Sequence, residues 1–398
     1  RAHRAPAGLD RAAVIRWILL AALISAAPAR AGLLEFSPGE RARIEAHGPW
    51  PPAREADPGN RVDGRADAIE FGRRLFADRR LSASGRLACA DCHDPQRAFQ
   101  DGQRAARQGR NTPSLIDSRL RRWFGWDGAH DSLWAASLAP LTAADELAAT
   151  PASVRALLDR DADLQARYRA LFGAPTADLA ALVNVAKTLA AYQATLVSPR
   201  TAFDAFRDAL ARGDARAAAR YPEAAQRGLK LFVGEARCFF CHTGPAFTNG
   251  EFADVGRPFF TANGADAGRW GGLRRLLASP YTRLGRFSDA APDDARAIPT
   301  RHVVLEPRHY GEFKVPGLRG LGLSAPYFHD GSAATIEDVV RHYDQLDEGR
   351  LHADGGAPRA LLRALRLTPA QATDLASFLQ TLTDPAHALD RRVLVTRD

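Results

Sequence analysis

The four cysteines of this chain fall in two copies of one pattern, Cys-x-x-Cys-His, at residues 89–93 and 238–242. Thiols at this spacing can add across the two vinyl groups of a haem, and the adjoining imidazole can bind the iron from the proximal side. The alternatives are a four-thiolate zinc site or two disulfides, but zinc pairs usually lie within roughly 15 to 20 residues of each other and need no histidine. We therefore expect two c-type haems, bound by Cys89, Cys92, His93, Cys238, Cys241 and His242.

Length and composition indicate a globular protein that is not built to bind nucleic acid. The 398 residues suggest two or three domains, and a hydrophobic content of 46% is sufficient for real cores. Of the formal charge of +8, residues 1–31 carry +4 through five arginines and one aspartate, which leaves +4 for the rest. Basic residues are scattered and do not alternate with aromatics, so nucleic-acid binding has little support.

The N-terminus has the pattern of an export signal. An apolar stretch at 17–27 follows Arg11 and Arg16 and runs into Ala29-Arg30-Ala31, a small-x-small cleavage pattern. The stretch is shorter than the roughly 20 residues that span a bilayer, so an uncleaved anchor is the weaker alternative. We expect residues 1–31 to be removed, leaving a periplasmic protein without a stable membrane span, which agrees with covalent haem because c-type maturation occurs outside the cytoplasm.

The two haem segments resemble each other beyond the motif, which indicates an internal duplication. A Leu-Phe pair precedes each motif, and a phenylalanine and a glycine follow it: Leu75, Phe76, Phe99 and Gly102 in the first copy, and Leu231, Phe232, Phe247 and Gly250 in the second. We expect a mainly α fold with two cytochrome c-like haem domains. Their expected bounds are 32–212 and 213–398, with the boundary in the polar stretch 211–221.

Helical periodicity is strongest at two places. After Thr176, the apolar residues Leu179, Leu182, Val183, Ala186 and Leu189 share one face. Near the C-terminus, Thr368 can cap a helix that has Pro369 in its first position and Gln371 closing a capping box. An apolar stripe follows, made of Leu375, Phe378, Leu379 and Leu382.

Ordered segments of the chain resemble the dihaem cytochrome c peroxidase superfamily, in its MauG-like branch. Besides the haem motifs, the resemblance rests on Leu75-Phe76-Ala77-Asp78, Leu81-Ser82, Arg110-Asn111-Thr112-Pro113, Trp126-Asp127-Gly128, Phe313-Lys314-Val315-Pro316, Leu318-Arg319 and Ala325-Pro326-Tyr327-Phe328-His329-Asp330-Gly331. It implies two haem c groups, with the haem on His93 reacting with peroxide and the haem on His242 exchanging electrons with it. It also implies an active site near the domain interface.

The resemblance assigns further roles. Trp126 would relay electrons between the haems, Arg110 and Arg319 would contact the cofactors, and one Ca²⁺ would be held by Asn111 and the main-chain carbonyls of Ser324 and Pro326. Oxygen-rich coordination suits Ca²⁺. Asn111 could instead be a turn residue before Thr112-Pro113. Trp126 could instead be a structural core residue beside an Asp-Gly turn. We prefer this interpretation for Trp123 and Trp134.

Peroxide cleavage needs a group that moves a proton between the two oxygens and stabilises charge as the bond breaks. Glu146 stands 20 residues after Trp126, the interval that the family keeps for its catalytic glutamate, and Pro140 matches the family's distal proline. Alternatively, Glu146 is an exposed charge in the first turn of a helix after Thr142. The family's usual distal glutamine is replaced here by Ala136.

Two features indicate which haem is open. The loop from Asp94 to Gly109 contains no histidine, although classical members block the peroxidatic haem with one there. We therefore expect an open, high-spin first haem. Classical members also use a methionine as sixth ligand of the second haem, and this chain contains none.

The position matching that methionine is Tyr343. Helical phase supports it, since Ile336, Val339, Val340 and Tyr343 share one apolar face. A core tyrosine with a bonded hydroxyl is the alternative. His342 and His329 are the other candidate ligands.

Ligand identity separates the functions, because an anionic phenolate favours oxidised iron whereas a neutral thioether raises the haem potential. We expect an H₂O₂-dependent oxidoreductase of MauG/MbnH type that oxidises an aromatic residue of a partner protein, with Trp as the first choice, through a bis-ferryl state. The alternatives are a peroxidase drawing electrons from a small cytochrome c or cupredoxin, and a non-enzymatic dihaem electron carrier. The MauG-type relative has a surface Trp two residues before its second motif, where this chain has Ala236, so its partner or docking route differs.

Overall fold

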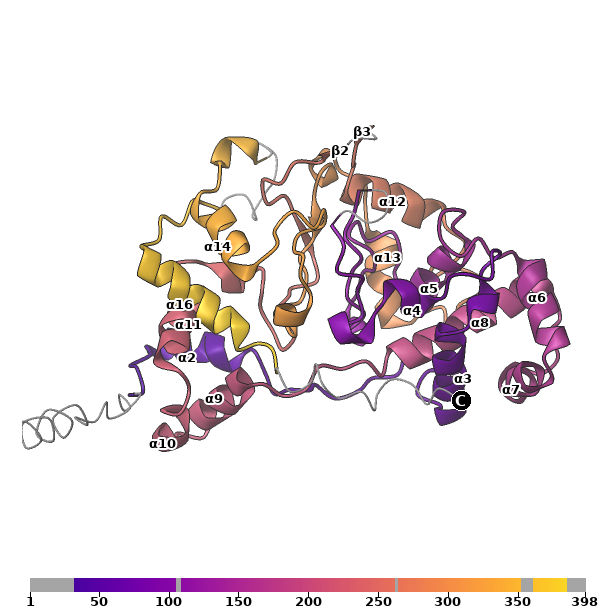
Figure 1. Cartoon of the computed structure of the whole chain (residues 1–398), viewed down its shortest axis with the longest axis horizontal. Helices are drawn as coiled ribbons and strands as arrows, with labels where there is room; N and C mark the ends of the chain where they lie inside the picture. Colours follow the sequence, from indigo (N-terminus) through magenta and orange to yellow (C-terminus); the bar gives the residue numbers. More distant parts are fainter. Residues whose placement is uncertain (1–31, 105–108, 262–263, 352–360, 385–398) are drawn as a thin grey trace, which may run out of the picture.

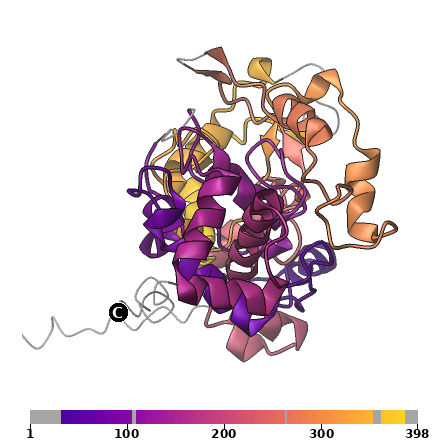
Figure 2. The ribbon, with the colours of Figure 1, turned by 90° about the vertical axis from the view of Figure 1, so that its right-hand side faces the viewer.

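The computed structural model describes residues 32–104, 109–261, 264–351 and 361–384. Helices dominate, and they gather in two lobes side by side along the long axis (Figure 1). Viewed along that axis, the helices of the first lobe lie in front of those of the second (Figure 2). The signal predicted for residues 1–31 lies outside the described residues. No helix in the described ranges is long and apolar enough to cross a membrane.

The first lobe is built on a core that extends from Val62 to Leu196. Its helices are α3 (Ala66–Phe76), α4 (Cys89–Cys92), α5 (Leu133–Thr142), α6 (Pro151–Arg160), α7 (Ala162–Phe172) and α8 (Asp178–Gln193). The long helix predicted from the apolar run after Thr176 is α8, so that prediction is confirmed. Its length is sufficient for α3, α5 and α6 all to pack against it.

The second lobe has its own core, from Phe203 to Leu382, to which Phe36 and Ile44 also belong. Its helices are α2 (Pro38–Glu45), α9 (Ala202–Ala211), α10 (Ala215–Ala218), α11 (Glu223–Val233), α14 (Ile336–Asp344) and α16 (Pro369–Gln380). The predicted cap of α16 is confirmed, because Thr368 and Gln371 form a reciprocal capping box.

The chain changes lobe between Leu196 and Phe203 rather than at residue 212, the boundary expected from the sequence. The reason is that α9 packs on α2, with the rings of Phe206 and Phe36 6.0 Å apart. The N-terminal segment that carries α2 therefore belongs to the second lobe, although it precedes the first haem motif.

Little of the chain is β-structure. Strand β1 (Phe252–Ala253) pairs antiparallel with β4 (Phe313–Lys314), and β2 (Phe260–Thr261) pairs antiparallel with β3 (Gly264–Ala265). Two further helices, α12 (Arg269–Ala278) and α13 (Ile298–His302), lie beside the first lobe (Figure 1). A small third core of Trp123, Phe252, Leu273 and Leu276 joins α12 to the loop before Trp126.

Both lobes contain the same close helix crossing. Gly72 of α3 meets α8, and a Cβ added at Gly72 would lie 2.0 Å from the Thr188 carbonyl oxygen. Gly228 of α11 meets α16 in the same way, with the Asp374 carbonyl oxygen 1.9 Å from an added Cβ. Each glycine lies four residues before the phenylalanine that precedes a haem motif, so the repeated packing supports the predicted internal duplication.

Candidate active site

Each haem motif forms a tight turn that ends at its histidine. The backbone N–H of His93 donates to the Cys89 carbonyl at 2.9 Å, and that of His242 donates to the Cys238 carbonyl at 2.9 Å. None of the four cysteines forms a disulfide, and all four are partly exposed. One turn thus carries two thiols and an imidazole, as covalent haem attachment requires.

The proximal imidazoles are oriented by main-chain carbonyls. Nδ1 of His93 lies 2.8 Å from the Phe99 carbonyl oxygen, and Nδ1 of His242 lies 3.0 Å from the Phe247 carbonyl oxygen. A carbonyl can only accept, so each Nδ1 carries the proton and each Nε2 keeps its lone pair. Two thiols outside any disulfide and an imidazole held through Nδ1 at each motif fit a c-type haem.

Glu146 lies in a turn at the first motif. Burial, together with the charges of neighbours that include Cys92 and Glu146, raises the pKa of the Cys89 thiol to about 12, so the carboxyl is close to the haem-binding thiols. The helix that the alternative required after Thr142 is absent, because α5 ends at Thr142 and a turn occupies residues 144–147. That alternative is wrong. The catalytic role itself stays a prediction.

Pro140 lies in the last turn of α5, one helical turn after Ala136. As a proline it has no N–H, and its ring offers no ligand atom to iron. Both residues are partly exposed on a helix that packs against α8. The described residues between Asp94 and Gly109 include no histidine.

Tyr343 lies on α14 beside the second motif. Burial raises the pKa of its phenol, and the Cys238 and Cys241 thiols add to that effect, so the three groups are neighbours. The two other candidate ligands are engaged elsewhere. Nε2 of His342 lies 2.8 Å from the Val255 carbonyl oxygen, and the His329 ring stacks on a phenylalanine at 3.4 Å between centroids. Tyr343 is therefore the best-placed of the three candidates for the second iron.

The loops that lead into α5 and α14 are two copies of one structure. Segments 124–130 and 327–333 are each closed by one antiparallel bridge, and each runs into a helix with a hydroxyl residue as its N-cap. Pro140 and Tyr343 are both the eighth residue after that cap, and they are 203 residues apart, as are the two loops. The duplication thus places a proline at the first site where the second has a tyrosine. The constant spacing could have shown this from the sequence.

Trp126 lies where the two halves of the chain meet. Its indole Nε1 donates to the Asn111 carbonyl at 2.7 Å, and its own carbonyl accepts from the backbone N–H of Lys314 at 2.8 Å. Its side chain is only partly buried, whereas those of Trp123 and Trp134 are almost fully buried. The core-anchor interpretation thus suits Trp123 and Trp134 better than Trp126.

Asn111 joins the two halves and has an orphaned oxygen. Its side-chain amide donates to the Pro326 carbonyl at 2.6 Å, and its backbone N–H donates to the His329 carbonyl at 2.6 Å. Its buried Oδ1 has no hydrogen-bond partner, and the two side-chain ends can be exchanged. With Oδ1 turned toward the Pro326 carbonyl, two oxygens face each other, and oxygens are the ligand atoms that Ca²⁺ prefers. No cluster of three or more His, Cys, Asp or Glu side chains in the described ranges offers another metal site.

The two arginines predicted to contact haem both have carboxylate partners. Arg110 binds Asp266 through two hydrogen bonds of 2.7 Å and also pairs with Asp127. Arg319 forms a fully buried pair with Asp204, with hydrogen bonds of 2.9 and 2.8 Å. Their roles toward the cofactors stay predictions.

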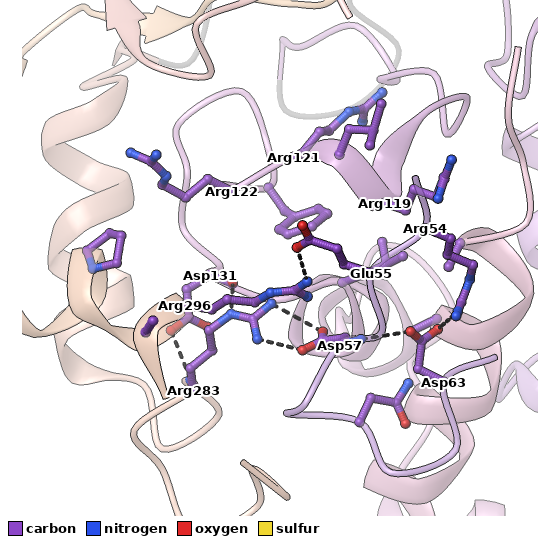
Figure 3. A pocket seen from close by; sticks show the side chains of 18 of the residues that line it. Arg54, Glu55, Asp57, Asp63, Arg119, Arg121, Arg122, Asp131, Arg283 and Arg296 are labelled. Atoms are coloured by element: carbon purple, nitrogen blue, oxygen red, sulfur yellow. Dashed lines mark hydrogen bonds and ion pairs between the residues drawn. The ribbon is translucent and has the colours of Figure 1, made fainter. Parts of the chain in front are cut away.

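A cleft of about 500 Å³ is lined by loop 52–63, loop 119–122 and the segment that leads into α13 (Figure 3). Most of its arginines are ion-paired: Arg54 with Asp63, Arg283 with Asp57, Arg296 with Glu55 and Arg122 with Glu251.

Arg121 differs, because it donates to the carbonyls of Ser114 and Ile116 at 2.7 and 2.8 Å. Burial lowers the pKa of Arg121 to about 10. Burial also lowers the pKa of His93, and the nearby charge of Arg121 adds to that effect. A partly buried guanidinium beside the first motif suits a haem propionate. The sequence could not identify it, since Arg119, Arg121 and Arg122 look alike there.

The family model described as di-haem cytochrome c peroxidase matches residues 66–212. The methylamine utilization protein MauG of Methylorubrum extorquens is 33% identical over 331 residues, which cover 80% of this chain and 79% of that protein. The chain belongs to the dihaem cytochrome c peroxidase family. Two haem c groups and a peroxidase-type oxidoreductase activity follow from that membership.

Other relatives place the chain within the family more broadly. The cytochrome c551 peroxidase of Nitrosomonas europaea is 28% identical and covers 77% of this chain, which spans 80% of that protein. A crystal structure of a MauG-like protein associated with microbial copper homeostasis has a TM-score of 0.61 at 28% identity, over 87% of this chain and 99% of that one. The diheme peroxidase BthA of Burkholderia thailandensis, at 23% identity and a TM-score of 0.60, covers 84% of this chain and 90% of its own, and supports the fold alone.

Proposed function

We propose that this dihaem peroxidase uses H₂O₂ to oxidise an aromatic residue, most directly a tryptophan, of a partner protein. The observation that carries the proposal is Tyr343, which lies beside Cys238 and Cys241 at the position where a conventional member needs methionine. A phenolate ligand favours oxidised iron, so the second haem is a poor acceptor of electrons from a high-potential cytochrome. It is better suited to holding an oxidising equivalent until a protein substrate docks.

The chain's own residues divide the work. Haem iron, when bound, supplies the redox chemistry by which peroxide takes up two electrons and two protons to give two waters. Glu146 moves a proton between the peroxide oxygens. Pro140 would offer the first haem no atom that can bind iron, and Trp126 would pass electrons between the lobes. Arg121 balances the negative charge of a propionate.

The electrons come from the partner, so the substrate need not reach the first haem. The indole Nε1 of Trp126 donates to the Asn111 carbonyl, and the main-chain carbonyl of Trp126 accepts from the backbone N–H of Lys314, which belongs to the other half of the chain. This fixed position suits a relay, because electron transfer through a side chain depends on a constant distance and orientation. We also propose that Asn111 and the carbonyls of Ser324 and Pro326 hold one Ca²⁺, and that the protein works in the periplasm.

The deciding experiment adds one equivalent of H₂O₂ to the purified diferric protein without reductant and follows the visible and near-infrared spectra. We expect a rapid change to a long-lived state that holds both oxidising equivalents, with a new near-infrared band. In Tyr343→His both haems stay attached and this state is lost. Tyr310→Phe is the matched control, because Tyr310 packs on Phe259 and lies in a different segment from the haem motifs.

The names of the relatives include conventional peroxidases, so the same experiment must separate the two activities. Reaction only after one haem has been reduced, followed by steady turnover with a small cytochrome, would make this a conventional peroxidase. An unchanged long-lived state in Tyr343→His would remove Tyr343 as the ligand. No reaction with peroxide in either redox state would leave an electron carrier.

A further inference from the structure

A histidine from the N-terminal segment is buried next to the second haem motif. His47 follows α2 and is 1% exposed. Its ring stacks on Phe247 at 4.1 Å between centroids, with the planes 8° apart. The rings of Phe203 and Phe232 also surround His47, with centroids 6.1 and 6.0 Å from that of the imidazole. The segment before the first lobe thus inserts an aromatic, hydrogen-bonding side chain into the second.

The polar contact of His47 is with the loop that follows the second motif. Its Nδ1 lies 3.0 Å from the Gly244 carbonyl oxygen, and since a carbonyl only accepts, Nδ1 carries the proton. The loop then reaches Phe247, whose carbonyl accepts from Nδ1 of His242 at 3.0 Å. His47 therefore holds this loop twice, by a hydrogen bond at Gly244 and by ring stacking at Phe247.

Neighbouring groups restrain the rest of the loop. Arg319 Nε donates to the Pro245 carbonyl at 2.6 Å, and Leu318 N–H donates to the Ala246 carbonyl at 3.3 Å. Every carbonyl from residue 244 to 247 thus accepts a hydrogen bond. Phe247 has φ +55°, a backbone conformation that a bulky residue adopts only when its surroundings impose it.

The corresponding loop of the first motif is held differently. The Phe99 carbonyl, which accepts from His93, also belongs to a residue with positive φ, +58°. Among the described contacts its ring meets Phe76 at 6.3 Å, and the preceding carbonyl, of Ala98, accepts from the Ser114 hydroxyl. A stacked histidine is found at the second loop only, so the second proximal ligand has a restraint that the described part of the first loop does not share.

We propose that His47 is a positioning residue for the C-terminal haem. By fixing the Phe247 carbonyl toward Nδ1 of His242, it strengthens the hydrogen bond that the axial imidazole donates. A stronger bond makes the imidazole a more basic ligand and stabilises oxidised iron. His47 acts through the loop and does not touch the iron. The proposal depends on the haem at His242 but not on the identity of the partner protein.

The test compares three variants of the full-length haem-loaded protein. His47→Phe keeps a ring to stack on Phe247 but removes the donor to Gly244. His47→Asn removes the ring and keeps an amide N–H that matches the position of Nδ1. Phe36→Leu is the control, because Phe36 belongs to the same N-terminal segment and the same core but packs on Phe206. The measurements are the reduction potential of each haem by spectroelectrochemistry, the EPR g-values of the C-terminal haem, and the melting temperature.

We expect His47→Phe to raise the potential of the C-terminal haem and shift its g-values while the N-terminal potential stays the same. His47→Asn should bring both readouts back toward wild type, and Phe36→Leu should lower only the melting temperature. If the C-terminal potential in His47→Phe equals wild type, or if both haems shift alike, His47 is only a core residue. Should His47→Phe not fold, His47→Leu, which also removes the donor to Gly244 and has nearly the shape of asparagine, replaces it. The C-terminal reduction potential of the replacement variant is then compared with those of wild type and His47→Asn in the same way.

Discussion

A proline and a tyrosine stand at equivalent positions of two haem sites that share the same loop, helix cap and proximal hydrogen bond. Pro140 and Tyr343 follow matching loops and matching helix caps, and each proximal histidine donates to a phenylalanine carbonyl. A proline has no atom that binds iron, whereas a phenol can lose its proton and bind it. On the function proposed above, this change of one residue type at one helical position would leave the first site free for peroxide and supply a ligand at the second.

At the residue scale, the first prediction concerns Glu146. Glu146→Gln keeps the shape of the side chain and removes its ability to take up a proton, so the reaction of the diferric protein with H₂O₂ should slow by roughly 10² or more. Stopped-flow spectroscopy measures this rate. Asp145→Asn is the control, because it removes an exposed carboxylate from the same turn. Near wild-type rates in Glu146→Gln would exclude the carboxyl from the mechanism.

Some residue assignments could be made from the sequence and others could not. Covalent haem attachment depends on local spacing in the sequence. The two motifs were therefore sufficient to predict the four cysteines and two histidines that bind the haems. One ion pair of Arg110 is with Asp266, which is 156 residues away in the chain, and no local pattern indicates that partner. Arg121 and His47 are likewise distinguished only by what surrounds them in three dimensions.

At the scale of elements, the paired helix crossings position both haem motifs. In each lobe a glycine lets one helix backbone approach the carbonyl of the next. Gly72→Ala and Gly228→Ala place a methyl group within 2.0 and 1.9 Å of a carbonyl oxygen, so the helices must separate. We expect each substitution to lower the free energy of unfolding by about 1–3 kcal/mol, the usual cost of overpacking. Chemical denaturation of the holoprotein measures the effect.

Gly39→Ala provides the matched control for those two variants. Gly39 lies in α2, and an added Cβ has no neighbour within 4 Å. Because alanine restricts the unfolded chain more than glycine does, Gly39→Ala should leave stability unchanged or raise it slightly. Equal losses in all three variants would mean that close packing at the two crossings is not what the glycines provide.

Periodicity and caps predicted elements better than they predicted the turns between them. Helices α8, α14 and α16 follow apolar stripes, and two of these helices have capping boxes formed by their own residues. The helix considered after Thr142 does not form, although Ala, Glu and Leu all favour helices. The chain instead turns back toward the end of α5. The Leu147 N–H donates to the Pro140 carbonyl, and Ala148 has φ +52°. These contacts close the turn that brings Glu146 to the first motif.

At the scale of the whole molecule, a buried histidine near the junction of the lobes makes stability depend on pH. Burial lowers the pKa of His329 to about 4, below the value of 6.5 that it has when exposed. The unfolded chain therefore binds a proton that the folded chain excludes, and stability falls as the pH is lowered from 6.5 toward 4. The full loss from this residue is on the order of 3 kcal/mol.

His329→Phe removes this titration and keeps the ring that stacks on Phe313. We expect the variant to lose less stability than wild type between pH 6.5 and 4.5 in denaturant titrations at several pH values. His302→Gln, a change at an exposed histidine, should follow the wild-type curve. A parallel pH dependence in wild type and His329→Phe would show that other groups control acid unfolding.

The junction of the lobes also gives the last prediction, because Asn111 is bonded across it to Pro326 and His329 while its Oδ1 remains without a partner. If one Ca²⁺ binds there, chelation should lower the melting temperature, since a ligand present at 100 times its Kd stabilises by roughly 2.7 kcal/mol. Asn111→Ala should abolish both the bound calcium and the effect of chelator. Asn184→Ala removes a comparable amide that donates to Tyr168 inside the first lobe, and should keep one calcium per chain. Calcium content by atomic absorption separates the outcomes: a wild-type protein without calcium, and indifferent to chelator, would mean that Asn111 joins the lobes by hydrogen bonds alone.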